Sequence, residues 1–561
     1  MTKAPKNTKL DQIAEEYVDN IAKNNPIEAT YLGIKGYDHL WPDFSPSGLE
    51  KTNKLHLYTL EKAKNVELEN VTDEITLKAM EERISLYNKL YVTGEQHRSL
   101  NNIESPLQAI RDIFDLQSQE TQEDFEKILT RLQNIDQPLQ GYIESLQYAK
   151  NKEHVSAKRQ IEAVCKQIDN LASSSSSLDL LEQTYSKLQN CDSSFQSTLK
   201  EAIQNAKCEF NKLKTYMQEE LIPLAPQEDA VGLERYKLLS QYHVGAVVDL
   251  DETYEWGQEE LNNIDKQQKE IAKELYGDNV SVMQALNNLN NEPRYILHGT
   301  KALQEWMQKT ADEAIQKLKG THFDIDPRIE TIECCIAPSS SGGIYYTGPS
   351  EDFTRPGRMW WSVPQGEDKF VTWQEKTTVY HEGVPGHHLQ VGQTICLTEQ
   401  LNRWRRLACW ISGHGEGWAL YSEQLMDELG YLNDPGERMG MLDAQRLRAS
   451  RVVLDIGVHL KKKAPSQYGD KLWDSNIAWQ FLKDNVAMNE TFLHFEWERY
   501  LGWAGQAPSY KIGQRLWLQA REEYLRTASG KGMEPTMKAF HKKALNIGSL
   551  SLDIMKEALQ K

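Results

Sequence analysis

The segment Tyr380-His381-Glu382-Gly383-Val384-Pro385-Gly386-His387-His388-Leu389-Gln390 places three histidines and a glutamate within eleven residues. A metal-binding helix commonly carries His-Glu-x-x-His, in which two histidines one turn apart reach the same ion. Here residue 385 is proline, and the next histidines follow His381 by six and seven positions. On an unbroken helix, position i+6 is turned by about 120° and position i+7 lies about 10 Å further along, so neither imidazole would share an ion with His381.

Pro385-Gly386 offers a way to restore the geometry. Proline removes a helix hydrogen bond and glycine permits a bulge. We therefore predict that the helix breaks at these residues. The break would bring His387, or as an alternative His388, to the place of the second ligand, with Glu382 as general base.

The third ligand should be a carboxylate on a following helix. Glu416 fits, because Gly415 and Gly417 on either side of it let a neighbouring helix approach closely. Zinc prefers imidazole nitrogen and carboxylate oxygen, and a hydrolytic site keeps one position open for water. We predict one zinc ion held by His381, His387 and Glu416. The alternatives are a helix-entry carboxylate at Glu416 and histidines that merely occupy the core or the surface.

Around this segment the chain reads as mainly α-helical. Apolar residues such as Leu10, Ile13 and Tyr17 recur at helical spacing through the first 320 residues. Two strands are expected at 331–336 and 355–363, with a Pro-, Gly- and Ser-rich segment (338–349) between them. We expect a large helical cleft protein with a small β-hairpin or sheet next to the metal-site helix. A soft boundary would separate a helical wall or lid lobe (1–325) from a catalytic lobe (326–561).

Bulk composition limits the classes of function. The 561 residues are 39% hydrophobic and 26% charged, which is typical of a soluble globular protein. The net charge of −18 argues against nucleic acid as a partner. No apolar run is long enough for a membrane span. The seven cysteines show no C-x-x-C spacing, so reduced thiols are expected.

The start of the sequence bears on the location of the chain in the cell. No apolar segment typical of a signal peptide follows Met1, which favours the cytoplasm. The alternative is a periplasmic or lipoprotein form that has lost its leader. A homodimer is a further possibility.

The motif set resembles a known family. His-Glu-x-x-Pro-Gly-His-His-Leu-Gln followed by Glu-Gly-Trp-Ala-Leu-Tyr-x-Glu is similar to the domain-of-unknown-function family 885, which is grouped with the gluzincin zinc metallopeptidases. The resemblance continues through Tyr345-Tyr346, Asp455-Ile-Gly457-Val-His459 and the late segment 499–513, and is clear from about 330 to 550. The loop 461–466 departs from the family pattern. The resemblance implies peptide hydrolysis in a deep helical cleft.

Other residues are candidates for stabilising the transition state or for binding the substrate, and each has a structural alternative. Tyr510 is the first choice as donor to the developing oxyanion, before His459 and Tyr346; a core aromatic is the alternative for Tyr510. Arg499 could bind the C-terminal carboxylate of a peptide, or pair with a nearby acid. The strand 358–363, which contains Trp360, could add to an extended substrate, or merely cover the core.

Orienting carboxylates behind the ligands are expected as well. Asp455 and Glu423 are the candidates for this role.

These expectations converge on a zinc-dependent hydrolase that acts on short peptides as a carboxypeptidase or dipeptidase. The same zinc chemistry would also allow an aminopeptidase, which is a further alternative. The alternatives are a zinc hydrolase of non-peptide amides or esters, and a catalytically inactive helical scaffold.

Overall fold

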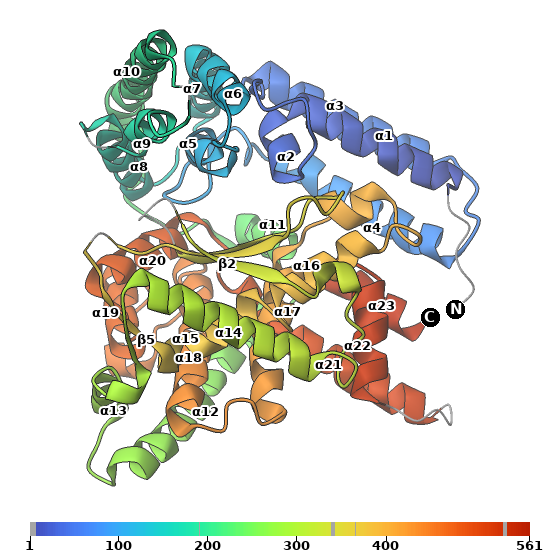
Figure 1. The fold of residues 1–561 in the computed structure, drawn as a ribbon, viewed down its shortest axis with the longest axis vertical. Helices are drawn as coiled ribbons and strands as arrows, with labels where there is room; N and C mark the ends of the chain where they lie inside the picture. The colour runs from blue at the N-terminus through green and yellow to red at the C-terminus, as the bar shows by residue number, and fades with distance from the viewer. Residues whose placement is uncertain are drawn as a thin grey trace.

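The computed structural model describes residues 7–561 apart from residues 175, 190, 338–342, 365, 470 and 531–535. The fold is mainly α-helical with a few short strands, as predicted (Figure 1). The first helices are α1 (Lys9–Asn24), α2 (Pro26–Tyr31), α3 (Pro46–Lys64), α4 (Val71–Val92), α5 (Pro106–Leu116), α6 (Gln122–Gln133), α7 (Asp136–Lys150), α8 (Lys158–Ala172), α9 (Ser177–Tyr185) and α10 (Ser193–Tyr216).

Thirteen more helices follow among the described residues of the second part of the chain. Before the sheet come α11 (Leu233–Val244), α12 (Leu250–Tyr276), α13 (Val282–Leu289) and α14 (Thr300–Leu318). After it come α15 (Thr372–Glu382), α16 (His387–Cys396), α17 (Ser412–Glu428), α18 (Pro435–His459), α19 (Ser475–Asn485), α20 (Glu490–Gly502), α21 (Ser509–Gly530), α22 (Met537–Asn546) and α23 (Leu552–Gln560).

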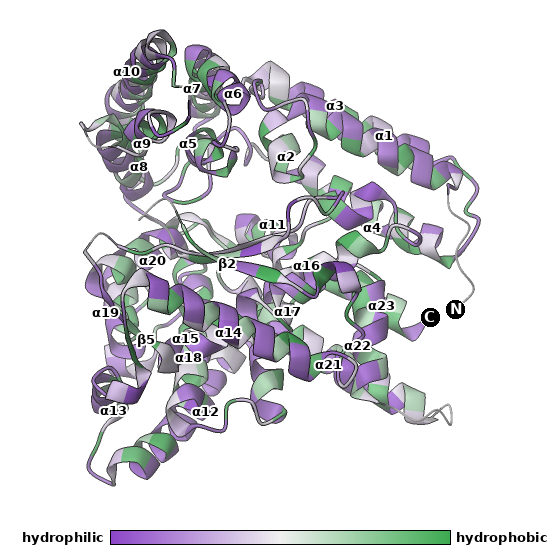
Figure 2. Cartoon of the chain, in the orientation of Figure 1, coloured by the Kyte–Doolittle hydropathy of each residue, from purple (hydrophilic) through white to green (hydrophobic). Residues whose placement is uncertain are grey.

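Local signals explain where representative helices begin. The Thr8 hydroxyl accepts a hydrogen bond from the Asp11 amide, and the Asp11 side chain accepts one in return from the Thr8 amide, which is a capping box at the start of α1. Asp434 caps α18 by accepting from two amides of its first turn, with Pro435 as the first helical residue. Apolar and polar residues alternate along the helices (Figure 2), and each apolar face packs inward.

Two hydrophobic cores result from this packing. One is built by α5–α10 together with Ile27 of α2. The other joins α1, α3 and α4 to α11–α23, so the two ends of the chain share a core. In Figure 1 the helices α5–α10 form a lobe above the sheet, and both termini lie on the same side of the molecule. The predicted boundary near residue 325 stays a prediction.

Two small sheets accompany the helices. β2 (Ile332–Ile336), β4 (Gly357–Trp361) and β3 (Ile344–Thr347) form one sheet in the order β2-β4-β3. β4 runs parallel to β2 and antiparallel to β3, so it is the central strand. β1 (Ile296–His298) pairs with β5 (Lys369–Val371), which leads directly into α15. Part of the expected turn segment, 338–342, lies outside the described residues.

Glutamine side chains of α14 cover the outer edge of β2. Gln308 accepts from the Cys334 amide and donates to the Ile332 carbonyl, while Gln304 donates to the Cys334 carbonyl. These bonds replace a neighbouring strand, because an unpaired edge would leave polar backbone groups unsatisfied. The small sheet that was predicted before the helix starting at Thr372 is present.

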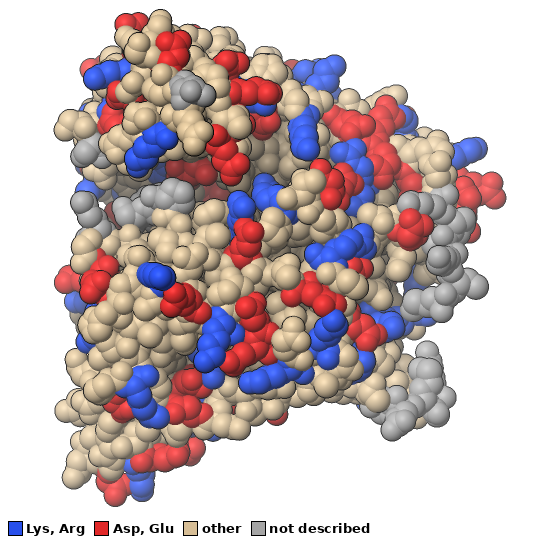
Figure 3. Space-filling model, in the orientation of Figure 1, with Lys and Arg blue, Asp and Glu red and all other residues tan. Residues whose placement is uncertain are grey.

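The surface in view carries charges of both signs. Lys and Arg side chains are interspersed with Asp and Glu over this face (Figure 3). Within the described residues, no helix combines the length and apolarity that crossing a membrane would require.

Candidate metal centre

The helix that carries His381 breaks where the sequence predicted. α15 ends at Glu382, and α16 begins at His387. Between them the chain forms a bulge closed by hydrogen bonds from the Gly386 amide to the Tyr380 carbonyl (3.0 Å) and from the His388 amide to the Gly383 carbonyl (3.1 Å). A Cβ atom at Gly386 would lie 1.9 Å from the His381 carbonyl oxygen, so only glycine fits there.

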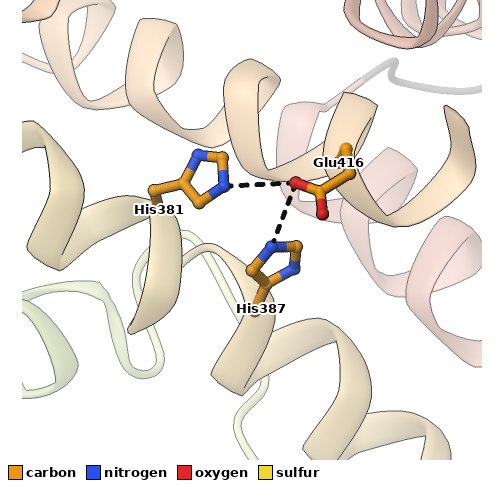
Figure 4. A group of neighbouring side chains, drawn as sticks. All are labelled: His381, His387 and Glu416. Atoms are coloured by element: carbon orange, nitrogen blue, oxygen red, sulfur yellow. Dashed lines mark ion pairs between the residues drawn. The ribbon is translucent and has the colours of Figure 1, made fainter. Parts of the chain in front are cut away.

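The bulge brings three predicted ligands together (Figure 4). His381 Nε2 lies 3.3 Å from Glu416 Oε2, and His387 Nε2 lies 3.4 Å from the same oxygen. The three ligand atoms all lie within 4.8 Å of one another. His381, His387 and Glu416 therefore form a group that could hold a metal ion.

The separations suit a small tetrahedral ion. Zinc binds imidazole nitrogen and carboxylate oxygen at about 2.0–2.2 Å, so two donors at tetrahedral angles lie about 3.4 Å apart. Both measured nitrogen–oxygen separations match this value. The donor set, two histidines and one carboxylate, also leaves one tetrahedral position free.

Glu423 orients the first histidine. Its Oε1 lies 2.7 Å from His381 Nδ1, and its Oε2 accepts a 2.6 Å hydrogen bond from the Thr377 hydroxyl. When Nδ1–H donates to this carboxylate, Nε2 is left as the metal-binding atom. Burial alone would lower the pKa of His381, but its bonds to Glu416 and Glu423 outweigh burial and raise the pKa to about 10.

Glu416 is held as an anion by the same contacts. Burial would raise the pKa of Glu416, but the charge of His387 and the hydrogen bonds from both imidazoles outweigh it and lower the pKa. A carboxylate that stays ionised is what a cation requires of its ligand.

Close helix packing positions Glu416. A Cβ atom at Gly417 would lie 2.4 Å from the backbone of Gly513 in α21, and one at Gly513 would lie 2.2 Å from the Gly413 carbonyl. α17 and α21 therefore touch backbone to backbone. On the other side, Trp418 Nε1 and the Ser422 hydroxyl of α17 both donate to the Pro385 carbonyl, at 2.8 and 3.1 Å, which fixes the bulge.

Glu382 lies beside the group as the expected base. Its Oε1 is 4.0 Å from His381 Nε2, and the residue is buried. Burial raises the pKa of Glu382, although the positive charges of His381 and His387 oppose the rise. A carboxylate with a raised pKa is suited to accept a proton and return it.

His388, the alternative second ligand, is placed elsewhere. It is fully buried, and its Nε2–H donates to the Ile329 carbonyl (2.9 Å) while its Nδ1 accepts from the Tyr346 hydroxyl (3.0 Å). Burial lowers its pKa to about 4. With both ring nitrogens bonded, His388 ties α16 to the sheet, and Tyr346 serves this contact.

Tyr510 lies within electrostatic reach of Glu416, whereas His459 is bonded elsewhere. Burial, followed by the negative charge of Glu416, raises the pKa of Tyr510. His459 is fully buried, and its Nε2–H donates to the Tyr500 carbonyl at 2.8 Å. The ring of His459 thus links α18 to α20. Among the described residues, no contact joins it to the candidate ligands.

Arg499 and Asp455 are committed to structural partners. Arg499 is buried and donates to Glu496 (3.1 Å) and Gln506 (2.9 Å), which is the structural pairing kept as the alternative. Asp455 accepts from the Tyr236 hydroxyl (2.6 Å) and the Gly505 amide (2.9 Å), so it clamps helices and does not orient a ligand.

Trp360 faces the sheet and not a free strand edge. Its ring stacks on Tyr345, and its Nε1 donates to the Thr347 hydroxyl at 2.9 Å. Because β4 is bonded on both sides, its backbone has no free edge for a peptide. Strand addition to β4 is therefore excluded by the order of the strands, which the sequence did not reveal.

Trp410 is a site residue that sequence reasoning missed. It is 49% exposed, although its ring lies 6.0 Å from that of His387 and fills the space that a side chain at position 415 would need. Its exposed indole face offers a flat apolar surface beside the candidate ligands. The only sequence signal was Gly415, whose missing side chain leaves room for the indole.

Comparisons with known proteins give the fold and the family. The chain is similar to a lipoprotein candidate from Colwellia psychrerythraea, with a TM-score of 0.83 and 21% identity over 98% of both chains. A lipoprotein candidate of unknown function from Shewanella oneidensis gives a TM-score of 0.72 and 16% identity over 99% of this chain and 100% of the other. A comparison with curated proteins finds no match.

A family model matches residues 26–559, which extends well before the segment 330–550 in which the resemblance was clear from motifs. The chain belongs to the family described as bacterial protein of unknown function, DUF885.

Proposed function

We propose that the protein is a zinc-dependent peptidase of the gluzincin type, with Glu382 as general base. The observation that carries the proposal is the shared position of His381, His387 and Glu416, at separations that suit tetrahedral zinc. Glu382 stands next to this group with a raised pKa. The Glu423 contact to His381 adds the carboxylate–histidine pairing that metal centres use.

Each residue has a defined role in the reaction. Zinc held by the three ligands would supply a Lewis acid that lowers the pKa of water and polarises the scissile carbonyl. Glu382 takes a proton from the attacking water as the new carbon–oxygen bond forms. It then delivers this proton to the leaving amine as the carbon–nitrogen bond breaks, so the carboxylate is regenerated.

Tyr510 is the proposed donor to the developing oxyanion. Its hydroxyl stays protonated at neutral pH, because burial and the charge of Glu416 raise its pKa. The Arg451 guanidinium lies over its ring, 4.8 Å from the centroid, which holds the ring in place. A preorganised donor of this kind stabilises charge that develops only in the transition state.

Peptides are the proposed substrates because exposed Trp410 lies beside the ligands. Its indole would pack against a substrate side chain. The cytoplasmic location and a homodimer stay predictions.

Digestion of a peptide mixture, followed by mass spectrometry, tests the proposal. The zinc-loaded protein should shorten peptides, the chelated protein should not, and readdition of zinc should restore cleavage. Glu382→Gln should hold zinc and leave the peptides intact. An intact mixture with the zinc-loaded wild type would contradict the peptidase, and turnover of amide or ester compounds by that protein would assign the rival hydrolase.

A further inference from the structure

Gln390 of α16 has a buried amide whose hydrogen bonding is incomplete at both atoms. Its Oε1 and its Nε2 are each buried without a hydrogen-bond partner, and the residue is 5% exposed. Within the part of the chain that the structure describes, no other side chain has two such atoms. Burying an amide without partners costs free energy, so Gln390 calls for an explanation beyond packing.

The candidate ligand His387 also has an unpartnered nitrogen. Its Nε2 faces Glu416 at 3.4 Å, whereas its Nδ1 is buried without a hydrogen-bond partner. Figure 4 shows this second nitrogen on the side of the ring away from Glu416. A histidine that binds a metal usually donates its other ring N–H to an oxygen, which fixes the direction of the ring. His381 has such an oxygen in Glu423, and His387 needs a counterpart.

Helix geometry places the two unpartnered side chains next to each other. His387 is the first residue of α16, and Gln390 lies three positions later. The Gln390 amide donates to the Gly386 carbonyl at 3.1 Å, so the first turn of the helix is closed. Residues at i and i+3 share one face, with Cβ atoms about 5–6 Å apart. A helical side chain leans towards the N-terminus of its helix, so Gln390 leans over the turn that carries His387.

The other polar side chains of α16 serve different contacts. His388 uses both ring nitrogens to tie the helix to the sheet. The Thr394 hydroxyl donates to the Gln390 carbonyl at 2.8 Å. Gln393 is turned by about 120° from His387, and its Nε2 donates to Asn546 at 3.3 Å. Gln390 is therefore the unused polar side chain on the face of α16 that carries the ligand.

We propose that Gln390 is a positioning residue of the metal centre, whose amide oxygen accepts the Nδ1–H of His387 directly or across one buried water. This inference rests on the metal site of the proposed peptidase. A proton held at Nδ1 leaves Nε2 free to bind the ion, as the contact to Glu423 does for His381. A buried water typically joins about three polar atoms that have no other partner, and this turn supplies three.

Zinc affinity, measured without any peptide, tests the inference. Gln390→Met keeps the length of the side chain and removes its hydrogen bonding. The dissociation constant of zinc, obtained by competition with a chelator, should rise by about 10- to 100-fold. Gln390→Glu keeps an oxygen acceptor in the same place and should restore most of the affinity. Equal affinities in wild type and Gln390→Met would overturn the inference.

The stability of the zinc-free protein separates a positioning role from a packing role. Replacing an unpartnered buried amide by an apolar side chain removes no hydrogen bond. The free energy of unfolding of Gln390→Met, measured by denaturant in the presence of a chelator, should therefore equal or exceed that of wild type. A clear loss of stability together with unchanged zinc affinity would make Gln390 a structural residue and overturn the inference.

Gln393→Met is the matched control, because it changes the same residue type on another face of the same helix. Its zinc affinity should match that of wild type. Equal losses of affinity in Gln390→Met and Gln393→Met would show a general effect on α16 and would contradict the specific role of Gln390.

The same measurements distinguish this inference from the proposed function. If Gln390→Met binds zinc more weakly than wild type while the zinc-loaded wild type cleaves no peptide, the peptidase fails and the positioning role stands. If the wild type cleaves peptides and Gln390→Met binds zinc equally well, the positioning role fails and the peptidase stands.

Discussion

Two buried polar clusters in this fold each centre on a glutamate, and they differ in the side chains that surround it. In the cluster of α18 and α20, Glu496 accepts from Arg451, Arg499 and Tyr500. In the candidate metal cluster, two imidazole nitrogens converge on one oxygen of Glu416. The carboxylate of the first cluster is paired with guanidiniums, which stay charged at ordinary pH. The second cluster offers imidazole nitrogen and carboxylate oxygen, the donors that zinc prefers, so the residue types indicate a structural cluster in one place and a candidate metal site in the other.

Removing the base should have the largest effect on function. Glu382→Gln keeps the shape of the side chain but cannot accept the proton, so kcat should fall by about 10²- to 10⁴-fold. Steady-state kinetics on the best peptide from the digestion measures the loss, and zinc content should match the wild type. Turnover within a few-fold of wild type would remove Glu382 from the role of base.

Breaking the structural cluster should instead cost stability. Glu496→Gln leaves two buried guanidiniums without their anion, so the free energy of unfolding should fall by about 3–5 kcal/mol. Denaturant unfolding measures this change, with zinc content as the readout that should stay the same. Zinc loss without destabilisation would assign Glu496 to the metal site.

The same carboxylate predicts a pH dependence. Burial would raise the pKa of Glu496, but Arg499 and Arg451 outweigh it and lower the pKa from the ordinary 4.5 to about 2. A lowered folded-state pKa contributes stability that is fully present above about pH 4.5 and is lost as the pH falls towards 2. Unfolding free energies measured from pH 6 down to about pH 3 should therefore decline less steeply in Glu496→Gln than in wild type.

Removing the orienting contact should weaken metal binding moderately. Glu423→Gln keeps a hydrogen-bond acceptor for His381 but removes its charge, so zinc affinity should fall by about 10- to 100-fold. Competition with a chelator measures the dissociation constant. Glu428→Gln is the control, because Glu428 lies on the same helix and pairs with Arg521. Equal affinities in both variants would show that Glu423 does not tune the ligand.

The smallest effect is expected at the sheet contact. Tyr346→Phe removes the hydroxyl that donates to His388, at a cost of about 1 kcal/mol in unfolding free energy. Thermal unfolding and peptide kinetics should show reduced stability with unchanged kcat/KM. A large loss of activity at unchanged stability would return Tyr346 to the role of oxyanion donor.

The local parts of the site could be predicted from the sequence. Pro385-Gly386 and the six-residue spacing of His381 and His387 define the bulge within one segment, because helix geometry excludes the alternative. The glycines on either side of Glu416 likewise indicated a close helix contact. The bulge depends on residues that are near in sequence, whereas the partner of the helix contact, Gly513, lies far along the chain.

The remaining parts depend on partners far away in the chain. Arg499 could bind a peptide carboxylate or pair within the fold, and only the positions of Glu496 and Gln506 show that it pairs within the fold. His387 and His388 are adjacent, and the Ile329 carbonyl decides that His388 is structural. The order of the strands is a third case, since the sequence left open whether the strand 358–363 has a free edge, and the structure places β4 in the centre of its sheet.

The zinc content of purified protein, after incubation with zinc and removal of the excess, tests the central claim most directly. The wild type and His388→Ala should each retain one ion per chain, whereas His387→Ala should retain none, because only His387 faces the shared oxygen of Glu416. A wild type without zinc, or His387→Ala with a full complement, would contradict the account.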